Sequence, residues 1–381
     1  MGYTVKKVSS KREMDDFVEL PRFIYRDNPY YVPDMDSDVR GMFVERKNPG
    51  LEHSSIQCFV AYDGAGRCVG RIVGIVNRWA NEIWNTHDVR FGMIEFIDDA
   101  EVSAALLNAV ETWGREQGMD RIVGPLGITD FDKEGMLVSD FDQKGSMVTI
   151  YNHAYYPRHM AGMNFVKEAE WVQMRIDIPR ETPKRIRRVA QLTREMYELR
   201  TVKFTRHQIL KEGYGKRIFD LFNAAYAPLF GFSKLSDKQQ IQYINKYIPL
   251  LDLRLMSVVV DKDDRMVGVA ISIGSLTDAL QKSRGRLMPI GWLHLLKELK
   301  LKHENKIEMI LVAVDPEFQG LGVNALFFDD LIPIYNELGY TWGEVAPQLE
   351  TNMKVLTQWR DFHPLVYKHR ICYSRKIVAG K

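Results

Sequence analysis

The sequence has few cysteines, and they form no recognisable pattern. Its 381 residues include three, Cys58, Cys68 and Cys372, and no Cys-x-x-Cys pair occurs. Such a small, odd number excludes a disulfide framework and suits a reducing compartment. The first residues also lack the apolar segment of a secretory signal. We therefore predict a cytoplasmic protein.

Long apolar runs, an excess of charge of one sign and metal-ligand spacing are also missing. No run of about 18 apolar residues occurs, so no transmembrane helix is predicted. The 52 basic and 50 acidic residues leave a net charge of +2, which gives no electrostatic reason to expect nucleic-acid binding. The nine histidines include no pair at the i, i+4 spacing of a helical metal site, so we predict no metal. Nothing in the sequence indicates the oligomeric state.

The chain does contain two halves that resemble each other. Residues 57–75 and 255–273 both read as an apolar strand, a polar turn and a second apolar strand, which predicts a β-hairpin in each half. Each half then predicts the order helix pair, hairpin, strand, helix, strand, helix, strand. The length also favours two domains. The identities that recur at a constant spacing are Val60/Val258, Asp63/Asp261, Arg67/Arg265, Val69/Val267 and Gly70/Gly268.

The second half contains a glycine turn between a predicted strand and a predicted helix. The apolar run 310–314 ends before Pro316, Gly320 and Gly322 follow, and a helical pattern begins at Ala325. Glycine lets the backbone adopt positive φ and approach an anion closely, and a helix N-terminus offers unpaired N–H groups to a phosphate. The turn is neither a Walker loop nor a dinucleotide-binding fingerprint.

This turn resembles the acyl-coenzyme A loop of the GNAT acyltransferase superfamily, Gln/Arg-x-x-Gly-x-Gly/Ala, except that Asn324 stands where that family has Gly or Ala. The resemblance implies an α/β protein of two tandem GNAT-like domains, each a twisted, mostly antiparallel sheet with helices on both faces. It also implies that the chain binds acetyl-coenzyme A or another acyl-coenzyme A, with the pantetheine beside the strand before the loop. The residues implicated in binding are Val312, Val314, Gln319, Gly320, Leu321, Gly322, Val323, Asn324 and Asn352.

The two halves differ in this loop, and the difference sets their expected roles. Residues 96–105 of the first half have no glycine between strand and helix, and the acids Asp98, Asp99 and Glu101 would repel a phosphate. We therefore predict a degenerate GNAT-like domain over residues 1–178 and a coenzyme A-binding domain over 201–381. Residues 179–200 read as a basic linker helix, and the second domain contains an insertion at about 277–306.

The catalytic acid and base are not fixed by the resemblance. The family often places a tyrosine seven residues after an asparagine at the start of the last helix, but Trp359 stands seven residues after Asn352. Tyr367 is close in sequence and is a candidate acid, or equally a strand residue packed on the sheet. Glu308 and Glu344 lie on predicted strands and are candidate bases, or equally structural carboxylates.

Two irregular segments carry further hypotheses. Residues 129–145 contain two similar turns, each with an Asp-Phe-Asp run before a glycine, and residues 151–156 are rich in aromatics. These aromatics either line the mouth of a pocket or are buried under a surface loop; a calcium loop is excluded because position twelve is Phe141. The insertion contains an amphipathic stretch with Trp292 and several lysines, Lys302 among them. It predicts a helix that packs on a domain, covers a long acyl chain or lies on a membrane surface.

Taken together, these patterns predict an N-acyltransferase that moves an acyl group, with acetyl favoured, from acyl-coenzyme A to the amine of a small molecule or peptide. The group transferred would not be an aminoacyl group. A second hypothesis is an inactive ligand-binding or regulatory protein on the same scaffold, which Trp359 and Asn324 favour. A third keeps the fold and uses an acyl-carrier or aminoacyl-tRNA donor, for which the basic run 184–188 is the one indication.

Overall fold

The computed structural model describes residues 2–300 and 304–378, and these pack into two compact units. The first unit comprises the described residues of 1–171, 277–295 and 368–381, and the second those of 172–276 and 296–367. The insertion therefore belongs to the first unit up to residue 295; residues 301–303 of the expected insertion lie outside the described residues. The domain ranges expected from the sequence remain a prediction.

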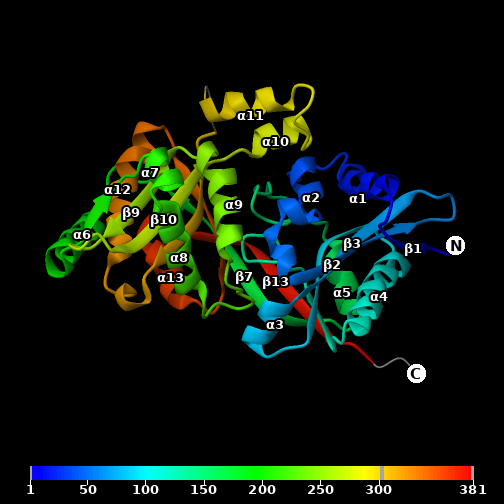
Figure 1. Cartoon of the computed structure of the whole chain (residues 1–381). Helices are drawn as coiled ribbons and strands as arrows, with labels where there is room; N and C mark the ends of the chain where they lie inside the picture. Colours follow the sequence, from blue (N-terminus) through cyan, green and yellow to red (C-terminus); the bar gives the residue numbers. More distant parts are fainter. Residues whose placement is uncertain (1, 301–303, 379–381) are drawn as a thin grey trace. The chain divides into compact units, whose positions relative to one another are not determined.

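The first half of the chain follows the expected order of elements (Figure 1). The hairpin strands and the strand 121–124 that ends at Gly124-Pro125 lie where the sequence placed them. The bounds are β1 (Thr4–Lys7), α1 (Lys11–Ile24), α2 (Asp36–Met42), β2 (Ser54–Tyr62), β3 (Cys68–Asn77), α3 (Arg78–Trp84), β4 (Asp88–Phe96), α4 (Ala100–Glu116), β5 (Arg121–Gly124), β6 (Met136–Leu137), α5 (Tyr155–Gly162) and β7 (Val166–Asp177).

The second half repeats this order after a connecting helix. The bounds are α6 (Lys184–Tyr197), β8 (Arg200–Val202), α7 (Arg206–Lys211), α8 (Tyr214–Tyr226), α9 (Asp237–Tyr247), β9 (Met256–Val260), β10 (Met266–Gly274), α10 (Thr277–Ser283), α11 (Gly291–Lys300), β11 (Lys306–Val314), α12 (Val323–Glu337), β12 (Trp342–Leu349), α13 (Met353–Thr357) and β13 (Leu365–Lys376).

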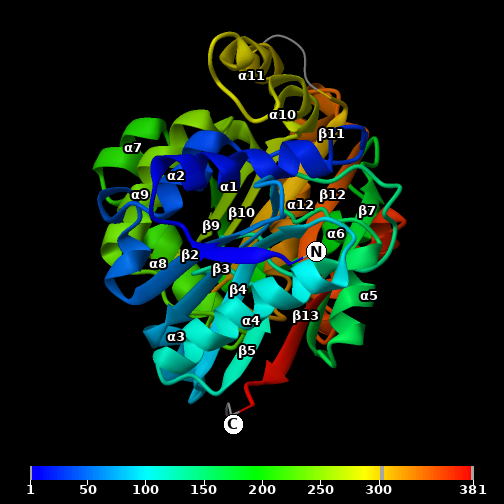
Figure 2. The ribbon, with the colours of Figure 1, turned by 90° about the vertical axis from the view of Figure 1, so that its right-hand side faces the viewer.

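Each unit is a mixed sheet with helices on both faces, as the sequence predicted. The first has the strand order β1-β2-β3-β4-β5-β13, and the second β7-β12-β11-β10-β9-β8. Only the pairs β4–β5 and β11–β12 are parallel among those described. In the first unit α4 covers one face of the sheet, and α1 and α2 cover the other (Figure 2). In the second unit α12 and α8 lie on opposite faces (Figure 1).

The equivalent hairpins of the two halves share their detailed construction. Asp63 Oδ1 accepts hydrogen bonds from the backbone N–H groups of residues 65 and 67, and Asp261 Oδ1 does the same for residues 263 and 265. Gly70 lies under α4 and Gly268 under α12, so closely that an added Cβ would come within 2.7 Å of a helix side chain in both cases. The recurring residues therefore serve the same purposes twice: they close the turn and admit the helix.

Each unit also contains a strand segment from the other half of the sequence. The end of β13 pairs antiparallel with β5 in the first unit, with Tyr373 opposite Gly124. The end of β7 contributes Met174 and Ile176 to the core of the second unit, where they pack with Ile307 and Val345. The last strand of each half thus completes the compact unit built mainly from the other half.

The insertion is attached to α1 and α2 of the first unit. Gln281 donates to the carbonyl oxygens of Pro29 and Tyr31, at 2.8 and 2.9 Å. Arg286 pairs with Glu19 at 2.5 Å. The insertion contains the helices α10 and α11. Among the described residues, no helix is long and apolar enough to cross a membrane.

Candidate functional site

Two neighbouring strands of the second unit part from each other beside the glycine turn. The strands β11 and β12 pair in parallel from Lys306, opposite Trp342, to Met309, opposite Val345. Both strands continue further, β11 to Val314 and β12 to Leu349, but in the described part of the chain their pairing with each other ends at Met309 and Val345. A proline lacks the N–H that a sheet requires, so Pro347 on β12 explains why the pairing stops there. The edge of β11 over residues 310–314 is thereby open to a strand-like ligand.

The glycine turn leads from β11 directly into the 15-residue helix α12. Gly320 and Gly322 have φ of +83° and +89°, which other residues rarely adopt, and Gly322 is the N-cap of α12. The N–H groups of the first helical turn, at Val323 and Asn324, have no partner within a helix. They add to the positive end of the helix dipole, so this turn has the features of an anion site.

Except for Asn352, the residues expected to bind the cofactor lie on the end of β11, in the glycine turn or in the first turn of α12, and some of their polar groups are already used. The Val312 carbonyl accepts from Tyr226 Oη at 3.0 Å, and the Gln319 side chain donates to the Val314 carbonyl at 3.1 Å. Asn324 donates to Gln358 at 2.6 Å. Leu321, Gly322 and Val323 continue the turn into α12. Asn352 caps α13 by accepting from the Val355 N–H, at 3.4 Å.

The connecting helix α6 packs against the glycine turn. Thr193 Oγ1 donates to the Leu321 carbonyl at 3.2 Å, and a Cβ added to Gly322 would lie 2.5 Å from that hydroxyl. Any side chain at Gly322 would therefore disturb packing as well as a ligand. Gly320 has open space around it, so a substitution there tests the anion site more cleanly.

The three catalytic candidates lie together in the second unit, around a lysine. Lys306 Nζ is 3.1 Å from Glu308 Oε1 and 3.0 Å from Glu344 Oε2. Tyr367 Oη donates to Glu344 Oε1 at 2.9 Å, and Gln173 donates to the same oxygen at 3.3 Å. The parallel register sets Glu308 directly opposite Glu344, which explains why their side chains meet at one cation.

Burial dominates the electrostatics of this cluster. Lys306, Glu308 and Glu344 are each 2% exposed. Burial raises the pKa of Glu308, and the neighbouring Glu344 carboxylate adds to the rise. Burial alone would lower the pKa of Lys306, but the two carboxylates outweigh it and raise that pKa. Burial and the Glu344 carboxylate raise the pKa of Tyr367. Such a cluster stays charged only because its members pair with one another.

The geometry of this cluster suits the positioning of strands better than contact with a substrate. It joins β11 to β12 over the last paired residues before the two strands part. A base or acid in direct contact with substrate would need at least one side chain open to the cleft, and of the three candidates only Tyr367 is partly exposed. Their catalytic roles remain predictions. Trp359 is 4% exposed and packs on Phe328, so it is a core residue.

Sequence reasoning missed a second group of carboxyls, in the first unit. Asp130 and Glu134 interact with each other and with the Arg90 guanidinium. Burial raises the pKa of Asp130 to about 7 and that of Glu134 well above its usual range. Asp132, in contrast, shapes the turn by accepting from two backbone N–H groups, at 2.8 and 3.0 Å. The sequence feature that could have revealed this group is the run Asp-Phe-Asp-Lys-Glu at residues 130–134. Among the described residues, no cluster of side chains suited to a metal ion is found.

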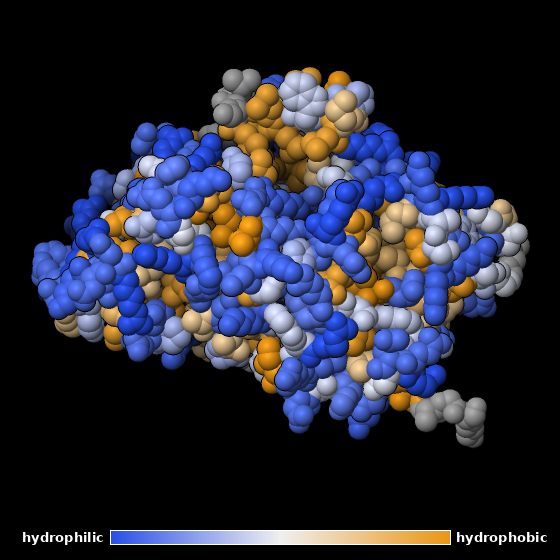
Figure 3. Space-filling view, in the orientation of Figure 1, coloured by the Kyte–Doolittle hydropathy of each residue, from blue (hydrophilic) through white to orange (hydrophobic). Residues whose placement is uncertain are grey.

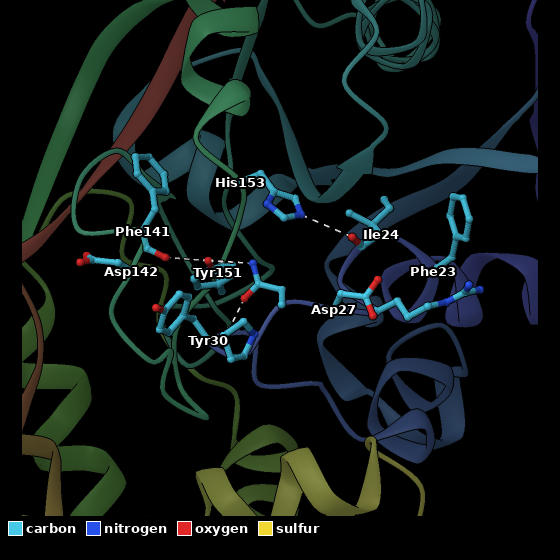
Figure 4. A pocket seen from close by; sticks show the side chains of 11 residues that line it. Phe23, Ile24, Asp27, Tyr30, Phe141, Asp142, Tyr151 and His153 are labelled. Atoms are coloured by element: carbon cyan, nitrogen blue, oxygen red, sulfur yellow. Dashed lines mark hydrogen bonds between the residues drawn. The ribbon is translucent and has the colours of Figure 1, made fainter.

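The first unit also has an open pocket of about 650 Å³ (Figure 4). Phe141, Tyr151 and His153 line it, so one of the two aromatic-bearing turns and the segment after it lie at a pocket, whereas Phe131 of the other turn is not among the lining residues. Its polar groups bond mainly to one another: Tyr151 Oη donates to the Phe141 carbonyl at 2.7 Å and accepts from Asn28 at 3.0 Å. The residues expected to bind coenzyme A do not line this pocket.

Comparison with known proteins supports the fold. No family profile matches the chain. Protein YghO of Escherichia coli (strain K12) is 25% identical over 322 residues, covering 83% of this chain and 79% of that protein. A protein named bacterial ceramide synthase, from Caulobacter vibrioides, is 24% identical over 318 residues, covering 83% and 81%. Among solved structures, a tandem GNAT protein from the clavulanic acid biosynthesis pathway matches with a TM-score of 0.56 at 12% identity, and the match covers 100% of both chains. The chain therefore has the fold of the tandem GNAT (GCN5-related N-acetyltransferase) proteins.

Proposed function

We propose that this protein is an N-acyltransferase that transfers an acyl group, other than an aminoacyl group, from acyl-coenzyme A to an amine. The proposal rests mainly on one observation: the open edge of β11, the glycine turn and the N-terminus of α12 follow one another directly in the chain. A thioester donor has a strand-like pantetheine arm and a pyrophosphate, and this one stretch of chain offers a partner for each.

The donor would bind entirely within the second unit. Its pantetheine would lie along residues 310–314 and pair with their free backbone groups, as an added strand does. Its pyrophosphate would accept hydrogen bonds from the backbone N–H groups of the turn 320–324. We propose a cytoplasmic location for the reaction, in keeping with cysteines that are all free.

The chemistry requires that the strands hold the thioester carbonyl in place while the amine attacks. A free backbone N–H on the open edge of β11 would stabilise the oxyanion that forms on this carbonyl. The cluster of Lys306, Glu308 and Glu344 would fix the point at which β11 and β12 part, and so the position of that N–H. Tyr367 is the candidate to protonate the leaving thiolate, directly or through water.

The relative in Caulobacter suggests the class of acceptor and donor. A ceramide is the amide of a long-chain amino alcohol and a fatty acid, so its synthase joins two lipid chains through nitrogen. We propose a long-chain primary amine as the acceptor and a long acyl chain on the donor. Acetyl transfer to a small molecule or peptide is the alternative from the fold.

Two other functions remain open on this scaffold. The buried Trp359 at the place of the usual acid favours a binding protein without turnover. A donor held by a carrier protein or a tRNA would use the basic start of α6, where Arg185 pairs with Asp361 at 3.1 Å. The turnover experiment below distinguishes these functions.

The test is release of free thiol from palmitoyl- and acetyl-coenzyme A, with sphinganine and a short amine as acceptors. Gly320→Asp sets a carboxylate beside the proposed pyrophosphate and should lower kcat/KM at least about tenfold. Gly66→Asp is the matched control, because Gly66 has a similar φ of +77° and equally open surroundings, but lies in the first hairpin. Turnover by wild type and Gly66→Asp but not by Gly320→Asp supports the proposal. If no thiol is released, calorimetric titration with the same acyl-coenzyme A separates the alternatives: binding without turnover favours the binding protein, and no binding favours a carrier-bound donor.

A further inference from the structure

The insertion gathers large apolar side chains on the outside of the protein. The exposed apolar residues are Leu287 (40%), Met288 (74%), Ile290 (60%), Trp292 (46%), Leu293 (47%), Leu296 (44%) and Leu299 (39%). They fall within residues 287–299, which we call the apolar segment. Figure 3 shows hydrophobic atoms gathered over the part of the surface that carries α10 and α11. Exposed apolar surface that is this concentrated marks a binding surface more often than chance.

One apolar face of α11 is exposed. Trp292, Leu296 and Leu299 recur at i, i+4 and i+7 and therefore share one face, and all three are exposed. The less exposed side of the helix holds His294, Leu295 and Glu298, so two of its three members are polar. A helix that stabilised the protein core would bury its apolar face. In α11 the face of Trp292, Leu296 and Leu299 is instead accessible to a binding partner outside the chain.

The charged residues of the stretch that contains the apolar segment are mostly basic, although one of them, Arg286, is paired with Glu19 and Asp36. Residues 282–300 contain Lys282, Arg284, Arg286, Lys297 and Lys300 but a single acid, Glu298. The net charge of this stretch is therefore +4, although the whole chain carries only +2. Tryptophan and lysine beside exposed leucines are the residues of helices that lie in a membrane interface, where basic groups attract anionic lipid headgroups.

Ion pairs and hydrogen bonds fix the start of the insertion on the first unit, and they fix the position of the apolar segment that follows. Lys144 pairs with Asp278, and Arg22 donates to the Arg284 carbonyl at 2.9 Å. The backbone then turns into α11 through hydrogen bonds from Trp292 N–H to the Leu287 carbonyl and from Leu293 N–H to the Ile290 carbonyl, at 2.9 and 3.0 Å. Exposure of the apolar side chains is therefore a property of the fold.

We propose that the apolar segment 287–299 docks this protein on the surface of an anionic phospholipid bilayer. The helix α11 has 10 residues, so it lies on the bilayer and does not cross it. A second copy of the chain is disfavoured, because a symmetric contact through the apolar segment would also bring together the flanking basic residues of two copies, and residues 282–300 carry a net charge of +4. The inference rests on exposure and charge alone and stands apart from the acyl transfer proposed above, although it would bring an enzyme to lipid substrates.

The test is cosedimentation of the full-length protein with vesicles, without donor or acceptor, so that its outcome is independent of catalysis. The vesicles are phosphatidylcholine alone or with about 30 mol% phosphatidylglycerol. The wild type should partition onto the anionic vesicles at least about tenfold more strongly than onto the neutral ones, and less as salt is raised. The double variant Trp292→Glu/Leu296→Glu should lose about tenfold or more of this binding.

The matched control is Met196→Glu/Ile241→Glu, which adds the same charge at apolar residues that are 68% and 57% exposed elsewhere. It should bind as the wild type does. Vesicles with brominated acyl chains should also quench the fluorescence of Trp292, and Trp292→Phe should remove this quenching while it keeps most of the binding. Equal loss in both double variants, no binding of the wild type, or a vesicle-independent dimer abolished by Trp292→Glu/Leu296→Glu would each overturn the proposal.

Discussion

The Lys306 side chain lies between two carboxylates that reach it from neighbouring strands. Its ammonium group is within 3.1 Å of both Glu308 and Glu344, and all three residues are 2% exposed. Removing the cation would leave two buried carboxylates facing each other. The cluster is thus a point where one substitution has consequences for both strands.

We expect Lys306→Met to lower the free energy of unfolding by roughly 3–5 kcal/mol at pH 8, because it strands two buried charges. The loss should shrink as the pH is lowered toward 5, because the raised pKa of Glu308 lets that side chain take up a proton and lose its charge. Urea unfolding at both pH values measures this. Lys216→Met is the control: Lys216 pairs with Asp220 on the surface and should contribute less than about 1 kcal/mol. Equal losses in the two variants would contradict the interpretation.

We expect Asp130 to make the stability of the first unit depend on pH. Burial raises its pKa to about 7, so the folded chain keeps a proton that the unfolded chain has released above about pH 4. The free energy of unfolding therefore falls as pH rises from about 4 to about 7 and does not fall further above that range on account of this group.

Asp130→Asn cannot ionise, so its stability relative to the wild type should increase by about 1–2 kcal/mol between pH 4.5 and pH 7.5. Urea unfolding followed at these two pH values checks the sign. Glu116→Gln, an exposed change, should alter stability by less than about 0.5 kcal/mol at either pH. A wild type that gains stability over this range relative to Asp130→Asn would show that the sign is wrong.

The sequence led to Glu308, Glu344 and Tyr367 as candidates, but not to the lysine that joins them. A strand pattern assigns Lys306 and Glu308 to one face of β11, whereas their meeting with Glu344 depends on the register between β11 and β12. Parallel register is set by packing of the connecting helix α12, which no local pattern encodes. The carboxyls of Asp130 and Glu134 were missed for a related reason, since the turn around them looked solvated.

At the scale of elements, the glycines of the two hairpins are the most sensitive test of the repeat. Gly70 and Gly268 occupy equivalent places and lie in close contact with α4 and α12. Each of Gly70→Ala and Gly268→Ala should lower the stability of its own unit by about 1–3 kcal/mol, since the new methyl overpacks the contact. Unfolding monitored by hydrogen exchange in each hairpin would measure this.

Gly64→Ala is the matched control, because Gly64 lies in the same first hairpin with no neighbouring atom within 4 Å of an added Cβ. It should change stability by no more than about 0.5 kcal/mol. If Gly70→Ala is equally harmless, the close packing of α4 on β3 is not as described.

The elements themselves were accessible from the sequence because their signals are local. The dipeptide Gly124-Pro125 ended the predicted strand at the residue where β5 ends. The polar residues between two apolar runs, with the recurring Asp63 and Asp261, predicted both hairpin turns, and the glycine turn at residues 319–324 predicted the start of α12. The parting of β11 and β12 was not predicted, since it appears only when Pro347 is seen opposite the open edge of β11.

At the scale of the whole molecule, the two compact units exchange their last strands. The sequence predicted two halves that each end in a strand, and local pattern cannot say which sheet that strand joins. In the structure Cys372 is fully buried in the first unit and Ile176 in the second, although each lies in the opposite half of the sequence. The contacts that decide this are distant in sequence and were therefore not predictable from periodicity.

Because each last strand belongs to the unit built mainly from the other half, a destabilising substitution in it should loosen that unit. Cys372→Asp buries a carboxylate in the first unit and should speed hydrogen exchange in β5 and α4 more than in β9 and α12. Ile176→Asp should do the reverse. Hydrogen–deuterium exchange with mass spectrometry resolves these segments. If Cys372→Asp instead speeds exchange in α12 more than in α4, the assignment of the last strand to the first unit is wrong.

The central claim is that the second unit binds an acyl-coenzyme A at the open edge of β11 and the glycine turn. The most direct test is calorimetric titration of wild type, Gly320→Asp and Gly66→Asp with acetyl- and palmitoyl-coenzyme A. We predict binding to wild type and Gly66→Asp, tighter for palmitoyl, and a loss of at least about tenfold in Gly320→Asp. Equal affinity of all three proteins for the ligand, or no binding to a folded wild type, would contradict the claim.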